Sequence, residues 1–129
     1  MRRMKIVLTD REAQFMEVLW EQGPSTVAEV RAQLEGDPAY TTVLSMLRTL
    51  EGKGYVGPTR DGRAHRYAAL ISRACAQKSA LSSLAQRFFK GSRELLLTHL
   101  LSEEKLSAEE VQRVRKLLAQ RQKNRGKSS

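Results

Sequence analysis

The sequence is poor in the residues that build disulfides, metal sites and catalytic centres. It holds a single cysteine, Cys75, in 129 residues, so no internal disulfide can form and a cysteine zinc site lacks ligands. Because alanines flank Cys75, we expect a buried structural thiol. The only histidines, His65 and His99, have no Cys, Asp or Glu at metal-ligand or triad spacing. We therefore expect no enzyme, no metal and no cofactor.

Long apolar segments are also absent. No run approaches the roughly 18 apolar residues that a membrane helix needs, and the N-terminus lacks the apolar part of a signal peptide. We expect a cytoplasmic protein without membrane insertion. With 40% hydrophobic but only 5% aromatic residues, the core should be mostly aliphatic. A chain of 129 residues fits one domain or two small ones.

Positive charge is plentiful but unevenly placed. The formal net charge is +9, which suggests a polyanionic partner. Residues 1–70 hold 10 Lys or Arg against 9 Asp or Glu, whereas residues 71–129 hold 13 against 5. Bulk charge therefore does not place a nucleic-acid site in the first half, and any such site must depend on local arrangement.

The first half begins with two helix signals. Thr9 with Glu12, and Thr26 with Glu29, have the spacing of capping boxes. The first helix should end at about Gln22, before a Gly-Pro pair. The side chains expected to face inward are Phe15, Met16, Leu19 and Trp20 in the first helix, and Val27, Val30 and Leu34 in the second.

A third helix is predicted over residues 40–54, directly after the helix-breaking residues 36–38. Its apolar side chains recur at helical period and are Val43, Met46, Leu47 and Leu50. Its polar side chains gather on the opposite side and are Thr41, Thr42, Ser45, Arg48 and Thr49. A solvated helix face has this composition, but so does a helix that lies in a DNA major groove and donates to phosphates and base edges.

The period changes from helical to two after Gly54. Two extended runs, Tyr55-Val56 and residues 64–68, flank a loop that contains Asp61-Gly62. Such a hairpin directly after a helix-turn-helix makes a winged helix. Its arginines suit phosphates or a minor groove because the guanidinium is planar and weakly hydrated. The expected DNA contacts are Thr41, Thr42, Ser45, Met46, Arg48 and Thr49 in the third helix, and Arg60, Arg63, His65 and Arg66 in the hairpin.

The second half reads as three further helices. They cover residues 72–89, 93–101 and a stretch that starts at the capping box of Ser107 with Glu110. About 60 residues of this kind bury too little surface alone, so we predict a helical dimerisation domain over residues 71–122 and a disordered basic tail over residues 123–129. The predicted dimer contacts are Leu81, Leu84, Phe88, Leu96, Leu97, Leu100, Leu101, Val111, Val114 and Leu118.

The expected fold class is therefore mainly α with a small β-hairpin wing. An N-terminal winged helix-turn-helix over residues 1–70 precedes the helical domain. Two alternatives stay open. The C-terminal helices could fold back on their own chain, and the winged helix could serve as a protein-protein interaction module without DNA specificity.

An ordered set of short motifs resembles the penicillinase-repressor family of bacterial winged-helix regulators, which includes beta-lactamase, methicillin-resistance and copper-homeostasis repressors. The resemblance covers about residues 7–120. The matching stretches are Leu8-Thr9-Asp10-Arg11-Glu12, Val18-Leu19-Trp20, Gly23-Pro24-Ser25-Thr26-Val27, Ala39-Tyr40-Thr41-Thr42-Val43-Leu44, residues 50–56, residues 60–64, Phe89-Lys90-Gly91-Ser92 and residues 106–110.

The resemblance implies a transcriptional repressor that binds a palindromic double-stranded DNA operator as a homodimer. Two-fold symmetry in the protein then requires half-sites about one helical turn, or a multiple of it, apart. A membrane sensor protease acting upstream is a further partner that the family suggests.

Departures from the family concern the inducing signal. Antibiotic-responsive members are cleaved at an Asn-Phe bond in the second domain, whereas this chain has His99-Leu100 at the corresponding place. Copper-responsive members carry Cys-x-Cys pairs near the C-terminus, which a chain with Cys75 alone cannot match. The inducing signal, the operator sequence and the controlled genes are not specified by these residues.

Overall fold

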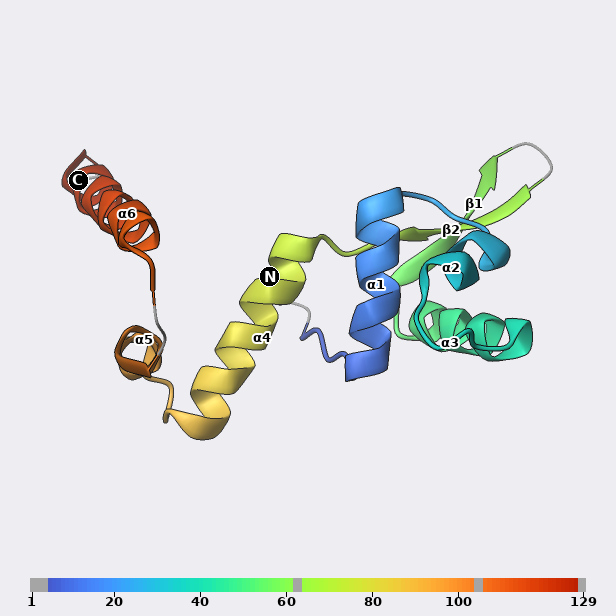
Figure 1. Cartoon of the computed structure of the whole chain (residues 1–129), viewed down its shortest axis with the longest axis horizontal. Helices are drawn as coiled ribbons and strands as arrows, with labels where there is room; N and C mark the ends of the chain where they lie inside the picture. Colours follow the sequence, from blue (N-terminus) through green and yellow to red (C-terminus); the bar gives the residue numbers. More distant parts are fainter. Residues whose placement is uncertain (1–4, 62–63, 104–105, 128–129) are drawn as a thin grey trace. The chain divides into compact units, whose positions relative to one another are not determined.

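The computed structural model describes residues 5–61, 64–103 and 106–127, and in these ranges it contains six helices and one two-stranded antiparallel sheet (Figure 1). The predicted fold class, mainly α with a small β-hairpin, is confirmed. Contacts divide the chain into two units, residues 1–84 and residues 85–129. We call the first the winged-helix unit and the second the C-terminal unit.

The first two helices of the winged-helix unit begin at the predicted capping boxes. α1 (Asp10–Gln22) starts after Thr9, whose hydroxyl accepts from the Glu12 N–H at 3.1 Å while its own N–H donates to the Glu12 carboxylate at 2.8 Å. Thr26 and Glu29 repeat this arrangement at the start of α2 (Val27–Gln33). Both predicted helix starts are confirmed, because each cap is a local interaction between residues three apart.

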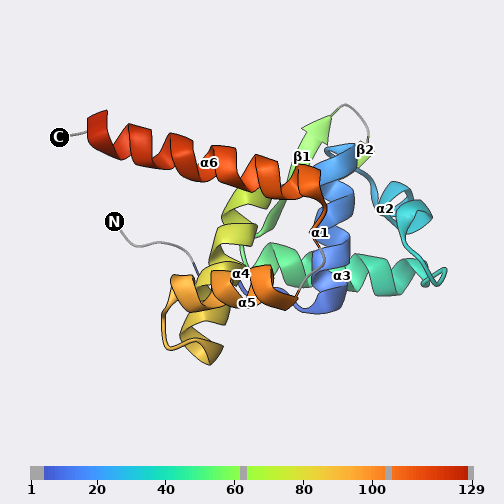
Figure 2. The same cartoon turned by 60° about the vertical axis from the view of Figure 1, so that its left-hand side comes forward.

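α3 and the hairpin form where the sequence pattern predicts them, but β1 runs five residues past the predicted end at Val56. α3 (Tyr40–Gly52) stops before Gly54, whose φ of 85° reverses the chain into the sheet. β1 (Val56–Asp61) pairs with β2 (Ala64–Ala69), and Ser25 adds a bridge to β2 through two hydrogen bonds with Tyr67. The hairpin projects from the helices in Figure 1, and α3 crosses α1 in Figure 2.

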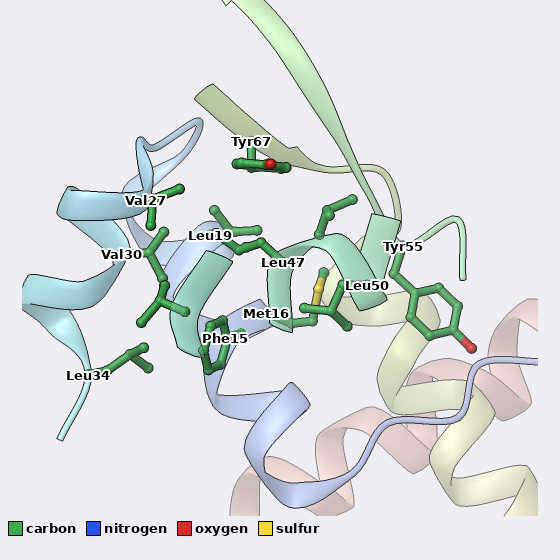
Figure 3. Packing of buried hydrophobic residues seen from close by; sticks show 12 residues of the cluster. Phe15, Met16, Leu19, Val27, Val30, Leu34, Leu47, Leu50, Tyr55 and Tyr67 are labelled. Atoms are coloured by element: carbon green, nitrogen blue, oxygen red, sulfur yellow. The ribbon is translucent and has the colours of Figure 1, made fainter. Parts of the chain in front are cut away.

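The core of the winged-helix unit lies where α1, α2, α3 and the hairpin meet (Figure 3). Its side chains are Phe15, Met16, Leu19, Val27, Val30, Leu34, Val43, Leu47, Leu50, Tyr55, Val56 and Tyr67. Full burial of one such side chain contributes about 1.5–3 kcal/mol. The aliphatic character expected from the composition is confirmed, and the predicted inward face of each helix supplies these residues. Trp20 is only partly buried and packs against the edge of the core.

α4 (Arg73–Phe88) contributes its first part to the winged-helix unit, and α5 (Arg93–Glu103) and α6 (Ala108–Lys127) belong to the C-terminal unit. Lys90 and Gly91 both take positive φ after α4, and the Gly91 N–H donates to the Ala85 carbonyl. This left-handed ending closes a helix and accounts for the predicted interruption there. The capping box of Ser107 with Glu110 opens α6 as predicted.

The structure differs from two expectations. Cys75 is exposed rather than buried, because it lies on the solvent side of α4. α6 continues to Lys127, so residues 123–127, for which the sequence predicts disorder, are helical; Arg, Gln and Lys all have good helix propensity. Contacts divide the chain between Leu84 and Ala85, since the start of α4 is hydrogen-bonded to α1 and to Ile6; the domain boundary at residue 70 stays a prediction.

Candidate nucleic-acid interface

α3 separates its apolar and polar side chains on opposite faces. Val43, Leu47 and Leu50 are fully buried, which fixes how the helix is rotated about its axis. The polar residues therefore face solvent, and we call them the α3 polar face: Thr41, Thr42, Ser45, Arg48 and Thr49. The Thr49 hydroxyl donates to the Ser45 carbonyl at 3.1 Å. The side chains of the other members of this face make no hydrogen bond to protein among the described residues, so their donors and acceptors are open to a ligand.

Met46 was predicted to contact DNA but also belongs to the apolar stripe of α3. In the structure it is partly buried and packs against the core. Its position at the border between the buried and polar faces leaves only part of its side chain available.

The turn before α3 is held by Arg31, a residue that the sequence reasoning did not select. Its Nε donates to the Pro38 carbonyl at 2.6 Å, and its guanidinium pairs with Asp37 at 3.4 Å. Asp37 has a positive φ of 45° in this turn. Arg31 thus ties the end of α2 to the residues that lead into α3 and fixes where the α3 polar face begins.

The hairpin presents some of its predicted contacts on the described strands. His65 is exposed in β2 and meets the Tyr67 ring edge-on, with 5.8 Å between ring centroids. Arg60 lies opposite His65 in the strand register. The side chain of Arg60, and Arg63 as a whole, lie outside what the structure describes.

Arg66 was predicted to reach DNA, and in the structure its guanidinium pairs with the Glu29 carboxylate of α2 at 2.5 Å. The Thr26 N–H hydrogen bond lowers the pKa of Glu29, and the charge of Arg66 lowers it further, so this carboxylate is ionised. The pair connects the hairpin to the start of α2. Glu29 therefore competes with any phosphate for Arg66.

An ion pair between a buried carboxylate and a partly exposed lysine connects α1 to the end of α3. Glu12 is only 3% exposed, and it accepts from Lys53 Nζ at 2.7 Å. Burial by itself raises the pKa of Glu12, but the hydrogen bonds from Lys53 and from the Thr9 backbone, with the Lys53 charge, bring it below its ordinary value. The pair joins the first turn of α1 to the residue that follows α3.

Glu12 is predicted from the sequence only as a helix cap, and its pairing with Lys53 is not. A signal for it exists, because Glu12 precedes Phe15, Met16 and Leu19 at helical spacing on the inward stripe of α1. A carboxylate on that stripe needs a cation.

The predicted dimer contacts divide by exposure. Leu96 is buried and Val111 and Val114 are partly buried, whereas the remaining seven are exposed: Leu81, Leu84, Phe88, Leu97, Leu100, Leu101 and Leu118. Leu95 and Leu117 are exposed as well. Large apolar side chains are thus exposed in both units, and their role as dimer contacts stays a prediction.

Neither metal ligands nor a membrane helix accompany these features in the described part of the chain. No three His, Cys, Asp or Glu side chains of residues 5–61, 64–103 and 106–127 gather in a group that could hold a metal ion. Over the same residues, no helix has the length and apolar character needed to span a bilayer.

Comparisons with known proteins agree with this arrangement. The sequence model of the family described as "Penicillinase repressor" matches residues 8–120. The transcriptional regulator BlaI of Mycobacterium tuberculosis is 37% identical over 123 residues, which is 92% of this chain and 88% of the relative.

Two solved structures share the fold. The monomeric form of Bacillus licheniformis BlaI in complex with the blaP half-operator superposes with a TM-score of 0.50 and 24% identity, over 56% of this chain and 90% of that one. A MarR family protein from Bacillus stearothermophilus gives a TM-score of 0.55 and 20% identity, over 94% of this chain and 77% of that one.

Proposed function

Because this chain belongs to the penicillinase-repressor family and is a DNA-binding transcriptional repressor, we propose that it acts as a homodimer on a palindromic operator in the bacterial cytoplasm. The proposal assigns base recognition to α3 and backbone contacts to the hairpin. The C-terminal helices hold the two chains together.

The observation that carries the proposal is the α3 polar face. Short hydroxyl side chains let a helix approach the floor of a major groove closely, and their groups can donate to or accept from base edges and phosphates. Arg48 adds one side chain that can make paired hydrogen bonds to guanine. Because the opposite face of α3 is fully buried, this surface is presented without rearrangement of the helix.

Pairing of two chains is supported by the apolar side chains left exposed in α4, α5 and α6. α5 has exposed leucines at positions 95, 97, 100 and 101, on several sides of the helix. Water contact with that much apolar surface is unfavourable by about 25 cal/mol for each Å². A second copy of the chain offers the same surface and satisfies a two-fold operator.

Release by proteolysis near His99-Leu100 would require a change in the structure. This bond lies within α5, and helical backbone must open locally before a protease can bind it as an extended strand. A membrane sensor protease is therefore compatible with the proposal only if α5 opens. Incubation of the DNA-bound repressor with the candidate protease, followed by mass spectrometry, would identify the cut.

The DNA-binding assignment is tested by footprinting the region upstream of the chain's own gene and then measuring affinity for the protected site. Arg48→Ala should weaken operator binding by roughly tenfold or more, the usual cost of losing a paired base contact. Affinity should also fall steeply with salt because phosphate contacts release counterions. Lys78→Ala is the matched control, since it removes an exposed positive charge from α4, away from α3.

Salt-insensitive binding with no protected site would contradict the assignment and favour the protein-protein interaction module. Equal losses for Arg48→Ala and Lys78→Ala would show that net charge alone, and not the α3 polar face, accounts for affinity.

The dimer is tested by placing a charge in its proposed interface. Leu97→Glu or Leu100→Glu should yield a monomer by sedimentation, with a large loss of operator affinity, because an unpaired carboxylate would be buried between the chains. Glu94→Gln on the exposed surface of the same helix should leave the dimer intact. An unchanged dimer for both leucine variants would contradict the interface.

A further inference from the structure

Arg73, the first residue of α4, is attached to the last turns of α1. One guanidinium nitrogen lies 2.8 Å from the Glu17 carboxylate and 2.9 Å from the Glu21 carboxylate, and Nε lies 3.4 Å from the other Glu17 oxygen. Glu17 and Glu21 are four residues apart, so they share one face of α1. A single planar cation thus holds two carboxylates of the same helix.

Trp20, which lies between Glu17 and Glu21 in the sequence, adds two further contacts to this attachment. The Arg73 guanidinium lies 5.6 Å from the centre of the Trp20 ring, and the Trp20 indole N–H donates to the Ile71 carbonyl at 2.9 Å. The residues that lead into α4 and its first side chain are therefore both tied to α1.

A second attachment lies nearly two helical turns further along α4. The Ile6 N–H donates to the Ser79 hydroxyl at 3.0 Å, and that hydroxyl donates to the Ile6 carbonyl at 3.2 Å. The neighbouring residue, Val7, donates from its N–H to the Tyr55 hydroxyl at 2.9 Å. The segment that holds Ser79 is thus fixed at the junction of α3 and β1.

Two separated attachments restrict α4 more than one would. A helix held at one point can pivot, but Arg73 and Ser79 are about 9 Å apart at 1.5 Å per residue. All the residues involved belong to the winged-helix unit. Leu81 and Leu84, the first proposed dimer contacts, follow Ser79 on the same helix and are exposed. These leucines are therefore held in a set direction relative to α3.

From this geometry we infer that Arg73 and Ser79 are positioning residues that set the spacing between operator half-sites. The inference rests on the proposed function, because spacing matters only if two chains bind one palindrome. No hydrogen bond to DNA is assigned to either residue. They act by fixing α4, so that the two copies of α3 in a dimer can reach only half-sites at a matching separation.

The experiment measures the affinity of the full-length protein for a series of operators that differ only in the spacer between half-sites. Each added or removed base pair moves one half-site by about 3.4 Å along the axis and about 35° around it. The wild-type protein should bind one spacing best. The readout is the affinity for the best spacing divided by the affinity for spacers one and two base pairs longer or shorter. Affinity for a single half-site is measured in parallel.

Two variants remove the first attachment with opposite changes in charge. Arg73→Gln removes a positive charge, and Glu17→Gln combined with Glu21→Gln removes two negative ones. Electrostatics should make the first bind all DNA more weakly and the second more tightly. In both variants the ratio of affinities between the best and the neighbouring spacings should nevertheless fall roughly fivefold, because an exposed ion-pair network is lost. Ser79→Ala should also flatten it, and Lys78→Ala is the control that should keep it.

The outcomes separate the inference from the proposed function. If sedimentation gives a monomeric wild-type protein, or if a second half-site adds nothing to affinity, the proposed function fails and the inference with it. If the wild-type dimer has a spacing preference that Arg73→Gln, the double glutamate variant and Ser79→Ala all retain, the inference alone is overturned. Half-site affinity and thermal unfolding identify any variant that fails to fold. The variants that do fold then decide whether Arg73 and Ser79 set the spacing preference.

Discussion

The Glu12 carboxylate takes part in two interactions that differ in range. One oxygen accepts from the Thr9 N–H and caps α1, and the other accepts from Lys53 at the end of α3. A buried carboxylate is costly unless it is both paired and hydrogen-bonded, and Glu12 meets both conditions. Since Lys53 directly follows α3, the pair helps to hold α3 against α1.

Glu12→Gln should lower the free energy of unfolding at neutral pH by about 1–2 kcal/mol, an estimate reduced because water reaches Lys53. The amide can still cap α1 but cannot pair with the ammonium. Because the folded state lowers the pKa of Glu12 from 4.5, the pair stabilises fully above about that pH. Its contribution is lost as pH falls through the lower folded value.

Urea unfolding of both proteins from about pH 3 to pH 7 checks this dependence. The difference between wild type and variant should be full near neutrality and shrink in acid. Glu35→Gln, at an exposed position, should show no comparable loss. A difference that stays constant down to the lowest pH would contradict a role for the ionised carboxylate.

Single residues were predictable where their partners are near in sequence. The three capping boxes were found because Thr or Ser and Glu stand three residues apart, and the buried residues of α3 were found from its period. The ion pairs Lys53–Glu12, Arg66–Glu29 and Arg73–Glu17 join residues 41, 37 and 56 positions apart. No periodic pattern connects such positions, so these interactions appear only once the chain is folded.

Among the elements, β2 and α2 are connected by the ion pair of Arg66 with Glu29. The Arg66 guanidinium can therefore bind a phosphate only in competition with the Glu29 carboxylate. The Arg66 side chain is partly exposed, so DNA can reach it. A phosphate that binds Arg66 must displace Glu29 or share the guanidinium with it. We therefore expect Glu29 of α2 to reduce the affinity of Arg66 for a phosphate.

Glu29→Gln should therefore raise affinity for DNA at low salt, by roughly twofold to tenfold, and the gain should shrink as salt screens the charges. The amide oxygen can still accept from the Thr26 N–H, so α2 keeps its cap. Fluorescence anisotropy with operator and random duplexes measures the effect.

The same substitution in an Arg66→Ala background is the matched control. If Glu29 acts through Arg66, the gain should disappear there. An equal gain in both backgrounds would mean that Glu29 acts only as a negative charge near the DNA.

The ends of the elements were less predictable than their existence. α3 stops at Gly52. β1 extends five residues beyond the predicted strand and β2 one, since strand pairing continues as long as a partner is present. α6 extends to Lys127 because its basic residues favour helix even without apolar neighbours. Composition did not predict the helical backbone of this segment.

Across the whole chain, composition changes at residue 70 but the compact units meet at residue 84. The first part of α4 is helical and apolar like the residues after it, so its sequence resembles the C-terminal half. Its contacts, however, are with α1 and the N-terminal segment. Which unit a helix joins depends on long-range contacts that the pattern of a single sequence does not contain.

A fragment of residues 1–84 should consequently be more stable than a fragment of residues 1–70. The shorter fragment lacks the Trp20–Ile71 and Ile6–Ser79 hydrogen bonds, each worth about 1 kcal/mol, and each loss should lower Tm by about 4–8 °C for a chain of this size. Thermal unfolding followed by circular dichroism compares the two. Ser79→Ala in the longer fragment should give an intermediate Tm, whereas equal Tm values for all three would contradict the assigned boundary.

The pairing of Ile6 with Ser79, 73 residues apart, has a consequence for the order of events during protein synthesis. The N-terminal segment leaves the ribosome first, but its partners Tyr55 and Ser79 follow much later. Domains generally fold as units while the chain emerges, so this unit is completed only when α4 has been made. Leu81 and Leu84 then emerge almost at once, so a nascent chain completes its winged-helix unit and exposes these proposed dimer contacts at nearly the same time.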